Sequence, residues 1–263
     1  MKLFTTLSVV AIMLVACSKR NTEASISKPI LERHSDGVCW RADTMGFFYN
    51  TDNTLERMYL THWGVINYNY IFRYANNKPY QFWRGYYLTD GADNIYGTFE
   101  YKEKGVNFNW STINRKQYDS LIFNDKQQLI ESYTVRPEFQ PMVGSIDRFF
   151  WDGGNVIKKE RYDAWTNDLY TTIYTYDDKK NIYPAGLAYV LIAPEFAYYL
   201  SANNIKEETT TRRNGAGYSY PVSHMKYRYL YNDKGLATDV MKSVYDEQGQ
   251  VVGSDSATVV YPK

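Results

Sequence analysis

Apolar and polar positions alternate along most of this chain, from about residue 40 to the C-terminus. Residues 66–74 read Ile-Asn-Tyr-Asn-Tyr-Ile-Phe-Arg-Tyr, with an aromatic or β-branched residue at every second position. Residues 81–88, 98–102 and 106–110 are similar strand-like runs, separated by clusters rich in Asn, Asp, Gly or Lys. Runs in which apolar and polar residues alternate, bounded by turn residues, are typical of short strands joined as antiparallel hairpins. The pattern therefore predicts a mainly all-β protein.

A loose repeat accompanies the alternation. An aromatic residue precedes Asn or Asp, a polar turn follows, and an aliphatic residue begins the next strand. The Asn or Asp side chain can cap its own turn, and a Gly in the turn accepts a positive φ. One hairpin cannot bury its own apolar face, so neighbouring hairpins must pair edge to edge. We therefore expect an antiparallel meander that forms one elongated, curved or barrel-like sheet. Copies of the repeat begin at Tyr49, Phe123, Trp151, Tyr231 and Tyr245.

One region departs from the strand pattern. Residues 185–200 are apolar, rich in Ala and Leu, and contain Pro194. Because proline suits the first turn of a helix, a short helix is predicted near 194–201. We expect the segment 185–201 to form a short helical or irregular plug or flap that covers an open face of the sheet. It does not require a second domain.

The first residues have the layout of a secretory signal peptide. Lys2 precedes an apolar run from Leu3 to Ala16, which at about 14 residues is shorter than the roughly 20 needed to span a bilayer. The run ends in Leu14-Val15-Ala16-Cys17, which resembles the lipobox of bacterial lipoproteins. The resemblance implies that Cys17 is acylated and anchors the chain in a membrane. A plain signal peptide followed by a coincidental cysteine is the alternative.

This interpretation divides the chain into three parts. Residues 1–16 are the predicted signal peptide. Residues 17–30 are polar and lack periodicity after the cysteine, and we expect them to form a lipidated flexible tether. Residues 31–263 form a single β-rich domain. With Cys17 lipidated, Cys39 has no cysteine partner and is predicted to be a small buried hydrophobic residue.

Composition excludes one class of partner and indicates a type of surface. Removal of residues 1–16 leaves 29 basic and 29 acidic residues, so charge gives no reason to expect a nucleic-acid partner. The 27 tyrosines favour half-buried sheet faces on which the hydroxyl groups stay in water. The simpler interpretation of the tyrosine content is a thin core with tyrosine-rich sheet faces. The more specific alternative is a surface on which carbohydrate stacks.

A family resemblance lies in the C-terminal half. Residues 174–181 (Tyr-Thr-Tyr-Asp-Asp-Lys-Lys-Asn), an apolar insert and residues 200–205 (Leu-Ser-Ala-Asn-Asn-Ile) are similar to a family of uncharacterised lipoproteins of Bacteroidota-type bacteria. The hairpins at 231–236 and 245–251 resemble the YD-type hairpins of RHS-like repeat proteins. The match covers roughly residues 120–262 and departs at Ile182, where the family often has Pro. It implies a β-rich, elongated or barrel-like sheet and no established activity.

The resemblance also bears on location. It implies a cell-envelope lipoprotein of the outer membrane. Surface export in that lineage is usually linked to acidic residues just after the lipidated cysteine, whereas residues 18–23 here begin Ser-Lys-Arg. We therefore expect the periplasmic face rather than the cell surface.

The chain shows no motif for metal or catalytic chemistry. His34, His62 and His224 have no metal-ligand spacing with another His or Cys, and the common zinc, phosphate-loop and nucleophile-elbow motifs are missing from the sequence. Residues 90–94 (Asp-Gly-Ala-Asp-Asn) lack EF-hand spacing and are predicted to be a solvated turn rather than a Ca²⁺ site. We expect no metal, no cofactor, no catalytic residues and no enzymatic activity.

Three functions remain open. The first is a non-enzymatic binding or structural module that takes a glycan or an envelope protein through its tyrosine-rich sheet or the 185–200 flap. The second is a half-barrel carrier of an apolar ligand, with that flap as its lid. The third is a hydrolase, which needs two acids, or a Ser and a His, within hydrogen-bond reach. The candidate stacking residues of the first are Trp63, Trp83, Trp110, Trp151 and Trp165.

Overall fold

The computed structural model describes most of the chain from Ile30 onward. The described residues are 30–34, 44–52, 54–62, 65–85, 95–110, 118–135, 143–183 and 197–261. The predicted signal peptide, Cys17, Cys39 and the turn at 90–94 lie outside them. The described residues form sixteen strands and one 3₁₀ turn, which confirms the all-β prediction. None of the helical residues among them makes a helix long and apolar enough to cross a membrane.

The elements follow one another in chain order. They are β1 (Ile30–His34), β2 (Thr44–Tyr49), β3 (Leu55–His62), β4 (Val65–Ala75), β5 (Lys78–Gly85), β6 (Ile95–Tyr101), β7 (Gly105–Trp110), β8 (Tyr118–Phe123), β9 (Leu129–Val135), β10 (Val143–Asp152), β11 (Asn155–Asp163), β12 (Asp168–Lys180), η1 (Ala197–Tyr199), β13 (Asn203–Arg213), β14 (Ser219–Tyr231), β15 (Ala237–Tyr245) and β16 (Val251–Val260).

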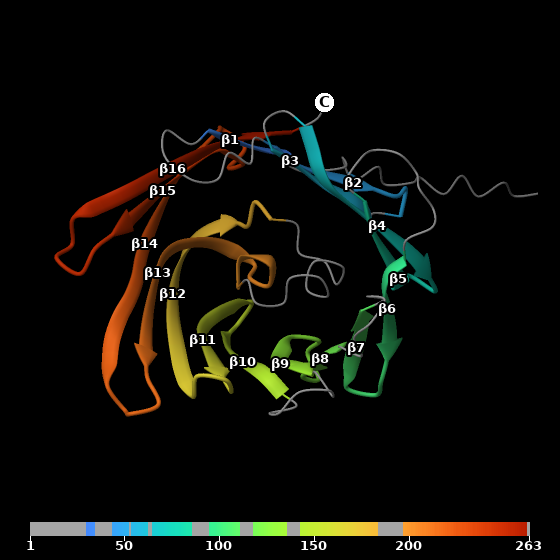
Figure 1. Ribbon diagram of the computed structural model, residues 1–263. Coiled ribbons are helices and arrows are strands. Elements are labelled where there is room, and N and C mark those ends of the chain that lie inside the picture. Colours follow the sequence, from blue (N-terminus) through green and yellow to red (C-terminus); the bar gives the residue numbers. More distant parts are fainter. Residues whose placement is uncertain are drawn as a thin grey trace, which may run out of the picture.

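Each strand pairs antiparallel with the strands before and after it, and β1 pairs with both β2 and β16. The sheet therefore closes into a ring, as Figure 1 shows. This confirms the predicted meander in its barrel-like form. The register places Ile30 opposite Val260, so both described chain ends lie at one end of the ring, which we call the terminal end. The turns β2–β3, β4–β5, β6–β7, β8–β9, β10–β11 and β14–β15 lie at the same end.

The apolar core lies on the inward face of the sheet. Phe82 and Phe108 are buried on β5 and β7, with ring centroids 5.7 Å apart in an edge-on arrangement. Phe99 stacks on Phe108 at 4.8 Å, and Phe72 packs on Phe82 at 5.5 Å. Such offset and edge-on aromatic contacts add to the free energy gained from burial. The alternating aromatic residues of the sequence therefore form the inner lining of the ring.

The outward face carries charged side chains in the middle of the described wall. Glu207 on β13 accepts a bond from His224 on β14 at 2.6 Å and lies 3.7 Å from the Lys226 ammonium. Arg148 on β10 pairs with Glu131 on β9 at 3.1 Å. His224, one of the three histidines of the sequence, therefore points away from the interior. Among the described residues no group of three or more His, Cys, Asp or Glu side chains could hold a metal ion.

The Asn-capped turns form as the sequence predicts. In the β14–β15 turn the Asn232 side-chain oxygen accepts the backbone N–H groups of Lys234 and Leu236, each at 3.0 Å. Gly235 follows with φ of 72°, the left-handed conformation that glycine adopts without strain. Each cap thus satisfies two backbone donors within five residues. The same pair of bonds recurs at Asn124, Asn214 and Asp246.

One of these turns has a non-glycine residue at the left-handed position. Gln127 has φ of 60° where Gly235 stands in the β14–β15 turn. The left-handed conformation costs an L-residue roughly 1–2 kcal/mol, part of which glycine's greater freedom in the unfolded chain offsets. We expect Gln127→Gly to raise the free energy of unfolding by about 0.5–1 kcal/mol in urea titrations, and Gly235→Gln to lower it by a similar amount. A change in the free energy of unfolding that has the same sign in both variants would contradict this explanation.

Candidate functional site

The connection between β12 and β13 runs into the space enclosed by the ring, which we call the lumen. Figure 1 shows the η1 turn lying inside the sheet. Its Ala197 and Tyr199 are buried, and the Tyr198 and Tyr199 rings pack against each other at 4.5 Å. Tyr183, just after β12, packs on Tyr198 in a tilted arrangement, with ring centroids 4.7 Å apart. The helical turn falls within the predicted 194–201, so the described part of the plug or flap lies within the lumen.

The motif residues on either side of this connection hold its two ends together. The Asn181 amide donates to the Ser201 carbonyl at 2.8 Å. The Asn204 side-chain oxygen accepts the backbone N–H of Ile182 at 2.8 Å, and its amide donates to the Lys180 carbonyl at 3.1 Å. Asn204 is almost fully buried, so these bonds stand in place of hydration. The Asn and Ser residues of the two motifs therefore join the end of β12 to the start of β13.

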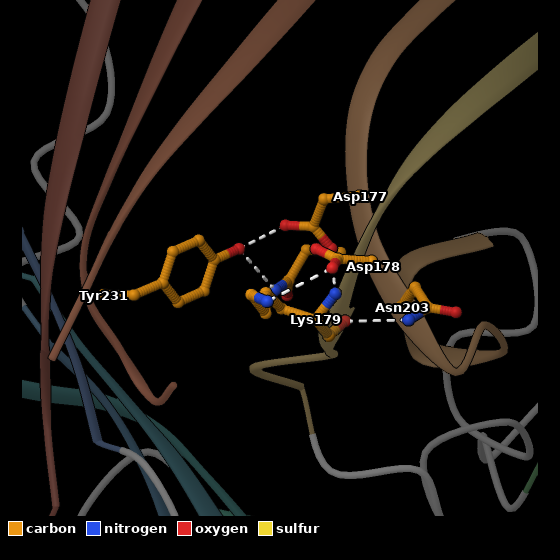
Figure 2. A network of polar contacts seen from close by, with 6 residues as sticks. Asp177, Asp178, Lys179, Asn203 and Tyr231 are labelled. Carbon is orange, nitrogen blue, oxygen red and sulfur yellow. Dashed lines mark hydrogen bonds and ion pairs between the residues drawn. The ribbon is translucent and has the colours of Figure 1, made fainter. Parts of the chain in front are cut away.

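A third strand joins this arrangement, as Figure 2 shows. The Tyr231 hydroxyl at the end of β14 donates to the Asp177 carboxylate and accepts from the Asn204 amide at 3.1 Å. Asp177 also accepts the Lys179 N–H at 2.9 Å, and the Asn203 amide donates to the Lys179 carbonyl at 2.9 Å. These contacts fix the connection relative to β12, β13 and β14. We call the following residues the insert clasp: Asp177, Asn181, Ser201, Asn203, Asn204 and Tyr231.

Five aromatic side chains near the terminal end make the same kind of hydrogen bond to the neighbouring strand, which the sequence did not reveal. Each lies at or near the end of an even-numbered strand and donates from its polar tip to a backbone carbonyl near the start of the preceding odd-numbered strand. Burial raises the pKa of the tyrosine hydroxyls among them, so they stay protonated and remain donors. The pairs are Tyr74 with Leu55, Tyr101 with Pro79, Trp151 with Leu129, Tyr176 with Val156, and Tyr229 with Ile205.

Two pockets flank η1. The first, which we call the inner pocket, has a volume of about 390 Å³ and lies between η1 and the β11–β16 wall. Ala197 and Tyr198 of η1 contribute to it. The second, the mouth pocket, has a volume of about 660 Å³ and lies at the terminal end between η1 and the turns of β5 to β10. Tyr199 and Leu200 contribute to it. Both volumes are in the range of small-molecule sites.

The inner pocket changes from apolar to polar along the axis of the ring. Strand register places Tyr229, Val240 and Ala257 side by side near the terminal end, with Ile205 and Tyr198 also lining this part. Further from that end the lining consists of hydroxyl and charged groups, with Met225 as the apolar exception. One polar row, formed by cross-strand partners, is Lys159, Thr172, Thr210 and Ser223.

Two of the charged groups of the inner pocket are already engaged. The Glu208 carboxylate accepts the Tyr227 hydroxyl at 2.8 Å. The Lys159 ammonium lies 3.8 Å from the buried Asp147 carboxylate. Burial raises the pKa of Asp147, while the charges of Lys159 and Arg161 oppose that rise. These contacts supply an internal counter-charge or donor to both groups.

Lys242 and Asp255 differ from this pair. They are cross-strand partners on β15 and β16, and both line the inner pocket. One oxygen of the Asp255 carboxylate is buried and has no hydrogen-bond partner in the described part of the chain. Buried polar atoms are nearly always hydrogen-bonded, so this oxygen marks a position for a donor. Lys242 forms no ion pair with another described residue. The pocket therefore presents an ammonium and a carboxylate side by side.

The described tryptophan candidates occupy three separate places. Trp151 lines the mouth pocket. Trp83 is half-buried on the outward face, 4.7 Å under the Arg73 guanidinium. Trp165 is exposed in the β11–β12 turn. Trp63 and the side chain of Trp110 lie outside the described parts of the structure.

The polar residues of the inner pocket were missed by sequence reasoning. Lys242 and Asp255 belong to no motif, and 13 positions of sequence separate them. Only the register between β15 and β16 brings them onto one face. The insert clasp, in contrast, lies in segments that the family resemblance had singled out: five of its six residues belong to the motifs at 174–181 and 200–205, and Tyr231 begins the hairpin at 231–236.

Comparison with known proteins gives a likeness of fold. No protein-family model matches the chain, and no curated protein matches it. A solved structure described as a porin-like protein from Bacteroides uniformis ATCC 8492 aligns with a TM-score of 0.54 at 11% sequence identity, covering 90% of this chain and 96% of that one. At this identity the likeness concerns the fold alone, an antiparallel β-sheet that the two proteins share.

Proposed function

We propose that this protein is a non-enzymatic, lipid-anchored binding protein of the cell envelope that holds a small zwitterion with an apolar body in its inner pocket. The observation that supports this most is the side-by-side placement of Lys242 and Asp255 in a pocket whose other end is apolar. Apolar dipeptides and apolar amino acids have this chemistry. The proposal modifies the apolar-carrier alternative by giving the ligand a charged head.

The two charges define how such a ligand lies. Cross-strand partners have Cβ atoms about 4.5–5.5 Å apart, so one zwitterionic head can reach both side chains. Its ammonium group would meet the unpartnered Asp255 oxygen, and its carboxylate would meet Lys242. Its apolar body would lie against Tyr198, Ile205 and Val240. A purely apolar ligand would leave the Asp255 oxygen buried and unsatisfied, at a cost of about 1–3 kcal/mol or more.

The outward face carries both charged and apolar side chains. Glu207, Lys226 and Arg148 lie on it in the middle of the wall, and exposed apolar side chains, among them Ile130, Phe150 and Ile157, lie on it nearer the terminal end. We propose that Cys17 carries the lipid and that residues 17–30 link it to the terminal end, where Ile30 begins β1. The terminal end would then face the outer membrane from its periplasmic side.

The test is calorimetric titration of the purified full chain with leucyl-phenylalanine, free leucine and free phenylalanine. We expect at least one of them to bind. Lys242→Met and Asp255→Asn should each weaken binding at least tenfold, which is about 1.4 kcal/mol. Lys226→Met is the matched control, because Lys226 lies on the outward face of the neighbouring strand, and it should bind as the unmodified chain does.

A second set of ligands checks which charge meets which residue. N-acetyl-leucyl-phenylalanine lacks the ammonium group and should bind the unmodified chain weakly, and Asp255→Asn should lessen this discrimination. Absence of binding by all three zwitterions, or equal binding by the Lys242→Met and Lys226→Met variants, would refute the proposal. Tight binding of lauric acid that neither pocket variant weakens would restore the apolar-carrier alternative.

A further inference from the structure

We infer that the mouth pocket is a second binding site, separate from the inner pocket, and that it takes a neutral oligosaccharide. The pocket is the larger of the two, at about 660 Å³, and lies at the terminal end of the ring. Its walls are the ends of β6, β8 and β10, the turns that follow them, Tyr199 of η1 and the next residue, Leu200. This inference does not depend on the ligand of the inner pocket.

Two aromatic rings in this pocket are held rigidly. Tyr101 donates its hydroxyl to the Pro79 carbonyl at 2.8 Å, and Trp151 donates its indole N–H to the Leu129 carbonyl at 2.8 Å. Each ring is therefore fixed by its polar tip to the wall, and both rings line the pocket while remaining only half-buried. A ring that is already fixed loses little conformational entropy when a ligand stacks on it.

The rim of the same pocket offers polar groups of both signs. Lys104 and Glu103 in the β6–β7 turn and Asp125 in the β8–β9 turn are exposed and line it. Among the described residues, neither Lys104 nor Asp125 takes part in an ion pair. Lys102, in contrast, pairs with Glu100. The rim therefore supplies free donors and acceptors without a strong net charge.

This combination matches the chemistry of a sugar. A pyranose ring has C–H faces that pack on aromatic rings, and hydroxyl groups that both donate and accept hydrogen bonds. A ligand of one net charge would meet like charges on part of the rim. An acyl chain cannot form hydrogen bonds with the rim groups and would displace the water that hydrates them. The volume leaves room for more than one sugar ring.

The two pockets share the connection that separates them. Tyr198 faces the inner pocket and the next residue, Tyr199, faces the mouth pocket. Their rings are in contact at 4.5 Å. Because the sites use different wall strands, substitutions at Lys242 are expected to leave saccharide binding unchanged.

The experiment is saturation-transfer NMR followed by calorimetry on the full chain with maltotriose, cellotriose and chitotriose as probes. We expect at least one trisaccharide to bind, with transfer strongest to its C–H protons. The double variant Lys104→Ala with Asp125→Ala should weaken that binding at least tenfold. Both residues are exposed in turns, so the variant should fold, which circular dichroism and thermal unfolding would check.

The chain supplies a matched control. Asp233 and Lys234 occupy the β14–β15 turn, where Asp233 stands in the position that Asp125 holds in the β8–β9 turn, and neither lines the pocket. The variant Asp233→Ala with Lys234→Ala should bind saccharide as the unmodified chain does. No binding of any of the three probes, equal weakening by both double variants, or loss of binding in Lys242→Met would overturn the inference.

Discussion

Replacement of Phe108 by alanine is expected to lower the free energy of unfolding by about 3–5 kcal/mol. The Phe108 ring is fully buried and contacts Phe82 and Phe99, with centroids at 5.7 and 4.8 Å. Truncation removes the apolar area and leaves a cavity that neighbours on a hydrogen-bonded sheet fill only in part. Urea unfolding followed by circular dichroism would measure the loss.

Phe150 provides the control for this substitution. It lies on the outward face, is 37% exposed, and has the Lys158 ammonium 3.7 Å from its ring centre. Phe150→Ala should therefore cost only about 1 kcal/mol. An equal effect of the two substitutions would show that the inward aromatic cluster is not the core.

Gly97 tests the same packing from the opposite direction. A Cβ at this position would lie 2.2 Å from the Phe108 ring, closer than any real contact. Gly97→Ala alone is expected to destabilise the chain, at a cost typical of overpacking, about 1–3 kcal/mol or more. Combination with Phe108→Leu should recover part of that loss, so the two effects should not add.

Replacement of Asn204 by alanine is expected to lower the free energy of unfolding by about 2–4 kcal/mol. The side chain is buried and makes three hydrogen bonds, with Ile182, Lys180 and Tyr231. Its loss leaves buried donors and acceptors without partners, each costing about 1–3 kcal/mol. Thermal and urea unfolding would measure the change.

The Asn204 substitution should also loosen the connection that the insert clasp holds. Trypsin cleavage after Lys179 and Lys180 is expected to accelerate in Asn204→Ala, because the clasp joins this segment to β13. Asn107→Ala is the control, since Asn107 is a strand asparagine that accepts one cross-strand bond, from Ser120. Unchanged proteolysis in Asn204→Ala, or the same loss of stability in both variants, would count against the clasp.

Local features were predictable because their causes lie within a few residues. The alternation at 66–74 corresponds to β4, Val65–Ala75, and the turn at 232–236 has the predicted Asn cap and left-handed glycine. The Asn-rich cluster that follows this strand occupies only two residues between β4 and β5. Asn76 and Asn77, with φ of 54° and 59°, make a two-residue turn, so Pro79 already lies in β5.

The candidate site was less predictable. The motif at 174–181 and 200–205 drew attention to the residues of the insert clasp, but nothing in it showed that they hold η1 inside the sheet. Trp151 was a candidate stacking residue, whereas Tyr101, the other fixed aromatic ring of the mouth pocket, was one tyrosine among 27. The tip hydrogen bonds that fix these two rings join residues 22 positions apart.

The sequence by itself determined the strands, the capped turns and the position of the connection that interrupts them. A period of two and the hydrogen bonds of Asn or Asp within one turn act over a few residues, so the chain encodes them locally. Tertiary structure alone decided that β1 pairs with β16, which closes the sheet. It also decided that Lys242 and Asp255 face inward together while Lys226 faces outward. The reason is register, because a shift of one residue between paired strands moves every side chain to the opposite face.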